Sequence, residues 1–260
     1  MILDAKNYSL PIKEIKEKFP EIKQWLNKNN KIDLGNPQAL YYYNKCLFKL
    51  LDDVDIDLSI QVDTEKNLIP TAGLRRAIVA VIMNLAKPSK IIEIGTGASA
   101  IMSLLFAKNG VKVIATEINE LSFASALHQI QLNHADQLIT LIKSTGGIFD
   151  YLEKYFPVDC VLSLPPYYAA DTKHIPKPSK RGFQGTDSEL YSFGEDIDFS
   201  LALLNEWYQL HSSTYLIILW KNLESVDKAL SIIKSFKINN QTIEIKAGTR
   251  KRYLTITTKV

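Results

Sequence analysis

Cysteine is scarce in this sequence. The 260-residue chain contains two cysteines, Cys46 and Cys160, which lie far apart within apolar runs. Two isolated thiols of this kind do not form the disulfide framework of a small secreted domain. We therefore expect both thiols to be buried and reduced.

Long apolar runs are also missing. No run reaches the ~20 residues that a transmembrane helix needs. The chain starts with MILDAKNYSLPIKEIKEKF, which contains acidic residues and no apolar signal core. From these two absences we expect a cytoplasmic protein that does not bind a membrane.

Histidine is too sparse to suggest a metal site. The four histidines, at positions 128, 134, 174 and 211, show no ligand spacing with one another or with either cysteine. A structural zinc site needs such a cluster of ligands. The sequence therefore predicts no bound metal.

Arginine is rare compared with lysine. The formal net charge is +3, which is too small to identify a partner, and only five of the 31 basic residues are arginines. Arginine presents a planar fork that matches carboxylate and phosphate groups, whereas lysine is mostly a solvated point charge. Each arginine is therefore a better candidate for a specific contact than any lysine.

The order of the predicted elements defines the fold class. Residues 1–86 have the periodicity of helices, predicted over 11–28, from Pro37 onward and after Thr71. From residue 87 to 260, short β-branched runs alternate with helices, including one predicted over 147–155, and the chain ends in a hairpin joined at 248–250. Such alternation predicts an α/β fold with a doubly wound sheet. The antiparallel C-terminal hairpin makes this sheet similar to the Rossmann-like domain of class I methyltransferases. We expect a small helical N-terminal module before it.

A glycine-rich turn after the first predicted strand of the sheet is the first candidate site. Gly95 and Gly97 allow the backbone to approach a ligand, and the following helix offers free N–H groups. Glu117 ends the next strand, where an acid can hold ribose hydroxyls. This segment alone fits an NAD-dependent dehydrogenase as well as an enzyme that binds S-adenosylmethionine (SAM).

Three features favour SAM over NAD. Glu93 lies at the strand end before the glycines, where a carboxylate suits the cationic amino acid part of SAM and would repel a pyrophosphate. The later sequence Leu164-Pro165-Pro166-Tyr167 is not required by a dehydrogenase. No separate substrate domain with an obvious acid–base histidine follows the sheet.

Residues 164–167 are the candidates for the second half of the site, where the substrate base would bind. An exocyclic adenine amine is a weak nucleophile, because its lone pair is conjugated with the ring. Acceptors on a polar side chain and a proline-flanked carbonyl localise that lone pair, and an aromatic ring stacks on the extruded base. We expect Leu164, Pro165, Pro166 and Tyr167 to form this base-receiving loop.

Taken together, these motifs resemble one family nearly from end to end. Besides the two loops, the matching segments are Leu34–Pro37, Leu68–Arg75, Ala115–Glu117, Gly146–Phe149, Gly194–Glu195 and Gly248–Tyr253. In order and spacing they resemble the RlmF-type adenine-N6 RNA methyltransferases. The resemblance implies a SAM-dependent enzyme that acts on the N6 amine of an adenine in a structured RNA, with ribosomal RNA processing as an expected role. It also implies that the N-terminal module helps to bind RNA.

The same resemblance extends the set of cofactor residues. It places Arg75, Gly95, Glu117, Ser144 and position 164 in the cofactor pocket. Together with Glu93 and Gly97, these are the residues that we expect at the SAM site.

One position departs from the family pattern. The family has Asn at the first position of the motif, where this chain has Leu164, which carries no side-chain acceptor. A buried amine hydrogen without a partner costs ~1–3 kcal/mol, or about a tenfold to hundredfold loss in rate. Three interpretations follow: weakened adenine-N6 transfer, a different target atom, or a SAM-binding RNA adaptor without catalysis.

Basic residues supply candidates for RNA contact. Four of them follow the base-receiving loop and two lie in the terminal hairpin: Lys173, Lys177, Lys180, Arg181, Arg250 and Arg252. A charged loop of this kind is often only a solvated surface. Because this loop follows the predicted active site, contact with the RNA backbone is as well supported as a solvated surface.

Overall fold

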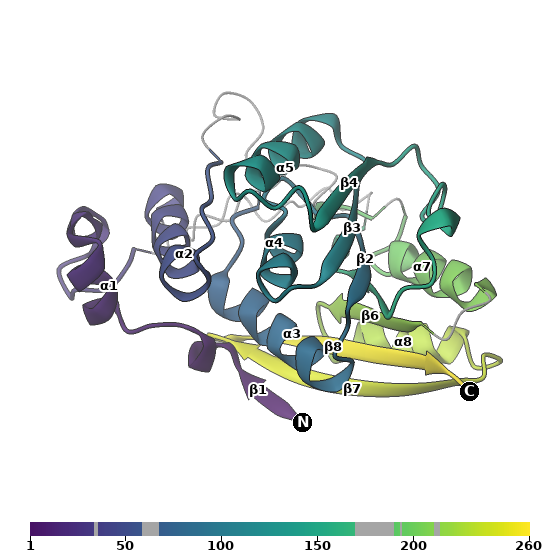
Figure 1. Cartoon of the computed structure of the whole chain (residues 1–260). Coiled ribbons are helices and arrows are strands. Elements are labelled where there is room, and N and C mark those ends of the chain that lie inside the picture. Colours follow the sequence, from purple (N-terminus) through teal and green to yellow (C-terminus); the bar gives the residue numbers. More distant parts are fainter. Residues whose placement is uncertain (34–35, 59–67, 170–189, 193, 211–213) are drawn as a thin grey trace.

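One mixed β-sheet forms the centre of the protein (Figure 1). The computed structural model describes residues 1–33, 36–58, 68–169, 190–192, 194–210 and 214–260. Its strands are β1 (Ile2–Asp4), β2 (Lys90–Ile94), β3 (Lys112–Glu117), β4 (Ile139–Lys143), β5 (Cys160–Ser163), β6 (Tyr215–Trp220), β7 (Ile238–Ala247) and β8 (Arg250–Lys259). The helices are α1 (Ile12–Lys18), α2 (Pro37–Asp52), α3 (Ala72–Leu85), α4 (Ile101–Lys108), α5 (Glu120–Leu132), α7 (Asp198–Gln209) and α8 (Leu223–Ile232), with 3₁₀ turns η1 (Ala5–Tyr8), η2 (Pro20–Trp25) and η4 (Glu153–Tyr155).

The strand order confirms the predicted fold class. The order is β1-β7-β8-β6-β5-β2-β3-β4, in which β2 to β6 run parallel and β8 is antiparallel to both of its neighbours. Strands β3 and β5 lie on opposite sides of β2. The chain therefore leaves the sheet in opposite directions around β2, and ligands of such sheets bind beyond the carboxyl ends of the strands at this point.

Alternating side chains of the strands build two cores, one on each face of the sheet. Ile91 and Ile217 belong to a core with α3, α4 and α5, whereas their neighbours Ile92 and Ile218 belong to a core with α7 and α8. Figure 1 shows these two helix layers on opposite sides of the strands. Burial on both faces explains why the parallel strands are continuous apolar runs.

The helix starts follow from local sequence signals. The Asn36 side chain accepts hydrogen bonds from the backbone N–H groups of Gln38 (2.9 Å) and Ala39 (3.2 Å), and Pro37 occupies the first turn of α2. Helix α3 begins directly after Thr71, as predicted.

Two helical predictions were wrong. The segment 11–28 forms α1 and then η2, because Pro20 restricts the residue before it and cannot continue a helix.

The second wrong prediction is the helix over 147–155. Only the 3₁₀ turn η4 forms in this segment, and the residues before it form bends and turns. Tyr151 has a φ of +64°, which is incompatible with a continuous right-handed helix. Three apolar contacts to the core at Phe149, Leu152 and Phe156 produce a pattern that resembles helical spacing.

The N-terminal strand β1 was not predicted. It pairs in parallel with β7, from Ile2 opposite Glu244 to Asp4 opposite Lys246. The region 1–86 therefore contributes a strand to the sheet as well as helices. A three-residue strand carries no readable periodicity, and its pairing depends on an edge formed some 240 residues later.

Side chains on both sides of residue 86 share one hydrophobic core. Ile15, Phe48 and Ile78 lie in the same cluster as Leu104 and Ile130. The division into a 1–86 module and an 87–260 domain stays a prediction. Within the described residues, no helix is long and apolar enough to cross a membrane.

A short extended segment, residues 55–58, is fixed through its backbone to the carboxyl end of α5; we call it the clamped segment. The Asn133 amide accepts from the Asp55 N–H and donates to the Asp55 carbonyl, both at 2.8 Å. The Gln129 amide accepts from the Asp57 N–H at 2.8 Å and donates to the Asp57 carbonyl. Gln129 on α5 and Asn133 at its C-cap, one helical turn apart, thus bind alternate residues of an extended chain, as a neighbouring strand would.

The opposite side of the clamped segment is bound by a tyrosine. The Tyr41 hydroxyl donates to the carbonyl of Ile56 (2.9 Å) and accepts from the N–H of Leu58 (3.2 Å). Ile56 itself is fully buried in the core. The clamped segment therefore connects α2 to α5.

Candidate active site

The loop after β2, residues 95–100, has a backbone that can receive a ligand; we call it the glycine loop. Gly95 and Gly97 have φ values of +74° and +68°, a left-handed conformation that glycine adopts without strain. Gly95 is exposed, and a Cβ placed on it would meet no atom within 4 Å. Open space therefore lies against the backbone at the position where a cofactor of this fold would approach.

Glu117 fixes this loop from the end of β3. Its carboxylate accepts hydrogen bonds from the N–H groups of Gly97 and Asn119, both at 2.8 Å, and the residue is 6% exposed. An ionised carboxylate offers about four lone-pair sites. Two of these sites are thus used within the protein, and the remainder can accept the hydroxyls of a ribose.

Glu93 supports the loop from inside the protein. Its carboxylate accepts hydrogen bonds from the hydroxyls of Thr96 (2.9 Å) and Ser103, and the residue is 2% exposed. Burial raises the pKa of this carboxyl from its ordinary 4.5 to about 7, although the two hydroxyls oppose the shift. Direct contact between Glu93 and the cofactor stays a prediction.

This raised pKa predicts a pH-dependent stability. The folded protein holds the Glu93 proton more tightly than the unfolded chain does, so the contribution is complete below pH 4.5 and is lost as pH rises through about 7. Relative to Glu93→Gln, we expect the free energy of unfolding to fall by about 2 kcal/mol between pH 5 and pH 7. Urea denaturation at several pH values measures this difference. Glu153→Gln, which removes an exposed carboxylate, should give the wild-type pH profile, and an unchanged profile in Glu93→Gln would contradict the account.

Ser144 lies beside the same carboxylate-bearing strand end. It follows β4, and its N–H donates to the Glu117 carbonyl (2.9 Å). Its hydroxyl donates to the Gly147 carbonyl at 3.4 Å. The structure thus brings the predicted residues Gly97, Glu117 and Ser144 together at the carboxyl ends of three adjacent parallel strands.

The base-receiving loop begins at the end of β5, the strand that pairs with β2. The Ser163 hydroxyl at the end of β5 donates to the Ile94 carbonyl at the end of β2 (3.0 Å). Leu164 is half-buried and packs against the core, and Pro165 is buried. The base-receiving loop and the glycine loop therefore leave adjacent, directly bonded strand ends.

The chain directly after the base-receiving loop is held by residues 190–192. The Tyr168 N–H donates to the Leu190 carbonyl (3.0 Å), and the Ser192 N–H donates to the Tyr168 carbonyl (2.8 Å). The rings of Tyr168 and Tyr191 lie 6.1 Å apart between centroids. The two hydrogen bonds form an isolated parallel β-bridge between Tyr168 and Tyr191, which gives the loop a defined course.

Two predicted arginines meet at Tyr167. The Arg252 guanidinium lies over its ring, 5.4 Å from the centroid. Burial raises the pKa of Tyr167, and the charges of Arg252 and Arg75 act in the opposite direction. Arg75 lies in the first turn of α3, where it donates to the Thr71 hydroxyl (3.2 Å). Charges from α3 and β8 thus act on one ring of the loop that follows β5.

Sequence reasoning missed Lys221. Its ammonium lies over the ring of Tyr168, 4.9 Å from the centroid. Lys221 directly follows β6, and its place at the carboxyl end of a parallel strand next to β5 was the one available signal.

The predicted RNA-binding residues fall into two groups. Lys173, Lys177, Lys180 and Arg181 lie outside the described residues. In the hairpin, Arg250 is exposed, whereas Arg252 is half-buried against Tyr167.

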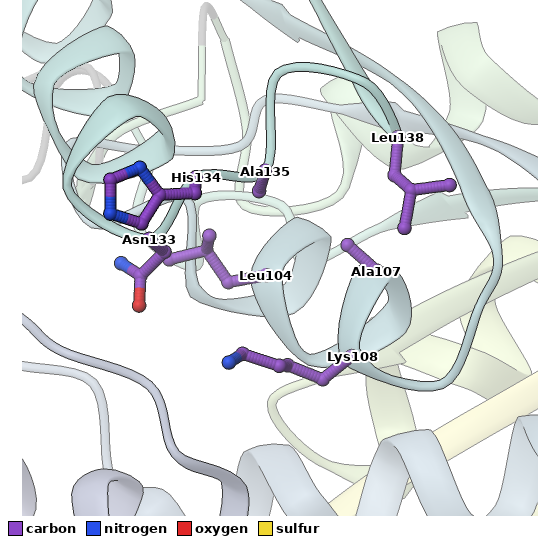
Figure 2. Close-up of a pocket in the computed structure, with 7 residues that line it drawn as sticks. All are labelled: Leu104, Ala107, Lys108, Asn133, His134, Ala135 and Leu138. Atoms are coloured by element: carbon purple, nitrogen blue, oxygen red, sulfur yellow. The ribbon is translucent and has the colours of Figure 1, made fainter.

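A separate pocket of about 180 Å³ lies away from this site. It is formed at the carboxyl ends of α4 and α5 by Leu104, Ala107, Lys108, Asn133, His134, Ala135 and Leu138 (Figure 2). These helix ends lead into the amino ends of β3 and β4, which is the opposite end of the sheet from the glycine loop. Among the described residues, no group of three or more His, Cys, Asp or Glu side chains is arranged to hold a metal ion.

Comparison with known proteins identifies relatives along most of the chain. The putative methyltransferase MJ0046 of Methanocaldococcus jannaschii is 32% identical over 244 residues, which cover 86% of this chain and 87% of the relative. The human RNA N(6)-adenosine-methyltransferase METTL16 is 28% identical over 219 residues, which cover 74% of this chain and 38% of the relative. The chain thus matches less than half the length of the vertebrate protein.

Solved structures with the same fold include the catalytic domain of human METTL16. The domain in complex with the MAT2A 3′UTR hairpin 1 matches with a TM-score of 0.79 at 22% identity, covering 95% of this chain and 90% of the other. The domain in complex with SAH matches with a TM-score of 0.77 at 20% identity over essentially both chains. At this level of identity, the likeness establishes the class I methyltransferase fold.

A family described as RNA methyltransferase matches residues 5–257, which is almost the complete chain. This match and the 32% identity to a putative methyltransferase agree with the resemblance seen in the motifs. The chain therefore belongs to the RNA methyltransferase family, whose methyl donor is SAM.

Proposed function

We propose that this protein transfers a methyl group from SAM to the N6 amine of an adenine in a structured RNA. The observation that carries the proposal is the adjacency of the two loops. The hydrogen bond from Ser163 to the Ile94 carbonyl joins the strand ends from which the glycine loop and the base-receiving loop depart. A methyl donor held by the first loop and a base held by the second would lie next to each other.

The described residues suit the nucleoside part of SAM. Open space over Gly95 and the carboxylate of Glu117 can receive a nucleoside with free ribose hydroxyls. The family match concerns methyltransferases, so we set the dehydrogenase alternative aside. Arg75 would bind the carboxylate of the cofactor, while Glu93 maintains the conformation of the loop.

On the base side, the chain supplies an aromatic ring and backbone acceptors. Tyr167 would stack on a base extruded from the RNA, and the carbonyls of Leu164 and Pro165 would accept the amine hydrogens. Positioning of the amine in line with the methyl group supplies much of the rate in a transfer of this kind. The names of the METTL16 relatives and the hairpin bound to one of them support adenosine in a folded RNA as substrate. Ribosomal RNA processing stays a prediction.

The direct test is incubation of the protein with labelled SAM and total RNA from its own source, followed by digestion and mass spectrometry of the nucleosides. We expect label in N6-methyladenosine. Label in another nucleoside would indicate a different target atom. Binding of SAM and RNA without any transfer would indicate the adaptor function instead.

Leu164 makes a second prediction possible. Leu164→Asn restores a side-chain acceptor for the second amine hydrogen, so we expect adenine-N6 transfer to rise by about tenfold to hundredfold. Single-turnover rates at saturating SAM measure the change. Leu164→Met, which supplies no amide acceptor, is the matched control. An unchanged or lower rate in Leu164→Asn would contradict our account of the loop.

A further inference from the structure

Tyr167 of the base-receiving loop and the following Tyr168 each lie against a cation that comes from the same end of the sheet. Arg252 comes from the beginning of β8, and Lys221 follows β6, the strand that pairs with β8. The Arg252 guanidinium lies over Tyr167 and the Lys221 ammonium over Tyr168. Cations over aromatic rings are attracted by the negative face of the ring.

The Arg252 guanidinium is itself fixed by the protein. Its Nη1 donates to the carbonyls of Lys251 (2.9 Å) and Lys221 (3.4 Å). The side chain is half-buried, whereas Arg250 is exposed at the tip of the same hairpin. Because a planar guanidinium held by two carbonyls has little rotational freedom, it can restrict the ring against which it lies.

The Tyr167 side chain packs against the core and stays partly exposed, so a cation over one face leaves exposed ring area for stacking. We propose that Arg252 is a positioning residue for base binding, whose guanidinium holds the Tyr167 ring so that the opposite face receives the target base. Lys221 restrains Tyr168 in the same way. This inference rests on the proposed function and refines it, because the sequence alone suggested that Arg252 contacts the RNA backbone.

The ring contact is tested without RNA or cofactor. The full chain is labelled with 3-fluorotyrosine, and the ¹⁹F resonance of Tyr167 is assigned by its loss in Tyr167→Phe. We expect Arg252→Gln to shift or broaden this resonance, Arg252→Lys to give a smaller change, and Arg250→Gln to leave the resonance in place. An unchanged Tyr167 resonance in Arg252→Gln, with the wild-type melting temperature, would overturn the proposal. If Arg252→Gln does not fold, the comparison of Arg252→Lys with Arg250→Lys decides in the same way.

The role in base binding is tested with an RNA hairpin that carries one unpaired 2-aminopurine in its loop. Stacking on Tyr167 quenches the fluorescence of this base, so we expect Arg252→Gln to lose at least half of the quenching in the bound state. A phosphate contact would instead lower the slope of log K against log salt by about 0.7–0.9. We expect that decrease for Arg250→Gln and not for Arg252→Gln.

The two experiments separate the inference from the function on which it rests. Failure of the hairpin to bind would contradict the proposed function while the ¹⁹F result still decides the ring contact. A loss of salt dependence in Arg252→Gln with full quenching would show that Arg252 is a phosphate ligand, and would overturn the positioning role.

Discussion

Glu117→Ala should lower the affinity for SAM by about a hundredfold or more. The carboxylate holds the Gly97 N–H and the Asn119 N–H, and its remaining lone pairs are the proposed acceptors for ribose. Hydrogen bonds to a charged group contribute about 1.5–3 kcal/mol each, and 1.4 kcal/mol corresponds to a tenfold change in affinity. Loss of the ribose contacts together with the loop conformation therefore exceeds the effect of one hydrogen bond. Isothermal titration calorimetry with SAM measures the change.

Glu120→Ala is the control for this result. Glu120 begins the next helix, its side chain is 80% exposed, and it pairs with Lys143 on the surface. Its removal should change the affinity for SAM by less than threefold, because an exposed ion pair contributes little. Glu117→Gln retains one acceptor oxygen and should give an intermediate affinity. A loss below fivefold in Glu117→Ala would refute the assignment of Glu117 to the cofactor site.

Gln129→Met should destabilise the protein by about 2–4 kcal/mol. Methionine matches glutamine in length and tolerates burial, but it provides no partner for the N–H and carbonyl of Asp57, which Gln129 binds in the wild type. Each backbone group that loses its partner in a part-buried position costs about 1–3 kcal/mol. The free energy of unfolding in urea gives the value.

Gln131→Met provides the matched comparison. Gln131 is an exposed residue of the same helix, so the identical chemical change should alter the free energy of unfolding by less than about 0.5 kcal/mol. If Gln129→Met is as stable as Gln131→Met, the clamped segment does not depend on the amide, and our description of its anchoring is wrong.

Much of the fold could be predicted from local sequence. The β-branched runs before Gly95 and Glu117 and the alternation of strands with helices indicate a parallel sheet, because burial on both faces demands such runs. Asn36 and Pro37 carry the start of α2 in their own chemistry. The glycines and Glu117 could be placed for the same reason, since they follow or end parallel strands that meet at one edge of the sheet, whereas Ser144 was implied only by the family resemblance.

The remaining features depend on partners that are distant in sequence. Lys221 is an ordinary lysine until β6 places it over Tyr168. Gln129 and Asn133 look like surface residues of a helix, and only the course of residues 55–58 turns them into ligands of a backbone. Glu93 was expected to face a cofactor, but its immediate partners come from its own loop and from α4. Such roles follow from tertiary contacts, which residue pattern does not encode.

The pairing of β1 with β7 has a consequence for synthesis of the protein. The first strand of the sheet to leave the ribosome cannot find its neighbour until nearly the whole chain has been made, because β7 begins at Ile238. Until then Ile2 and Leu3 have no partner strand, and once β7 forms its outer edge is open to any extended chain. Docking of the N-terminus onto this edge is therefore a late event, which covers the outer edge of β7 over residues 244–246.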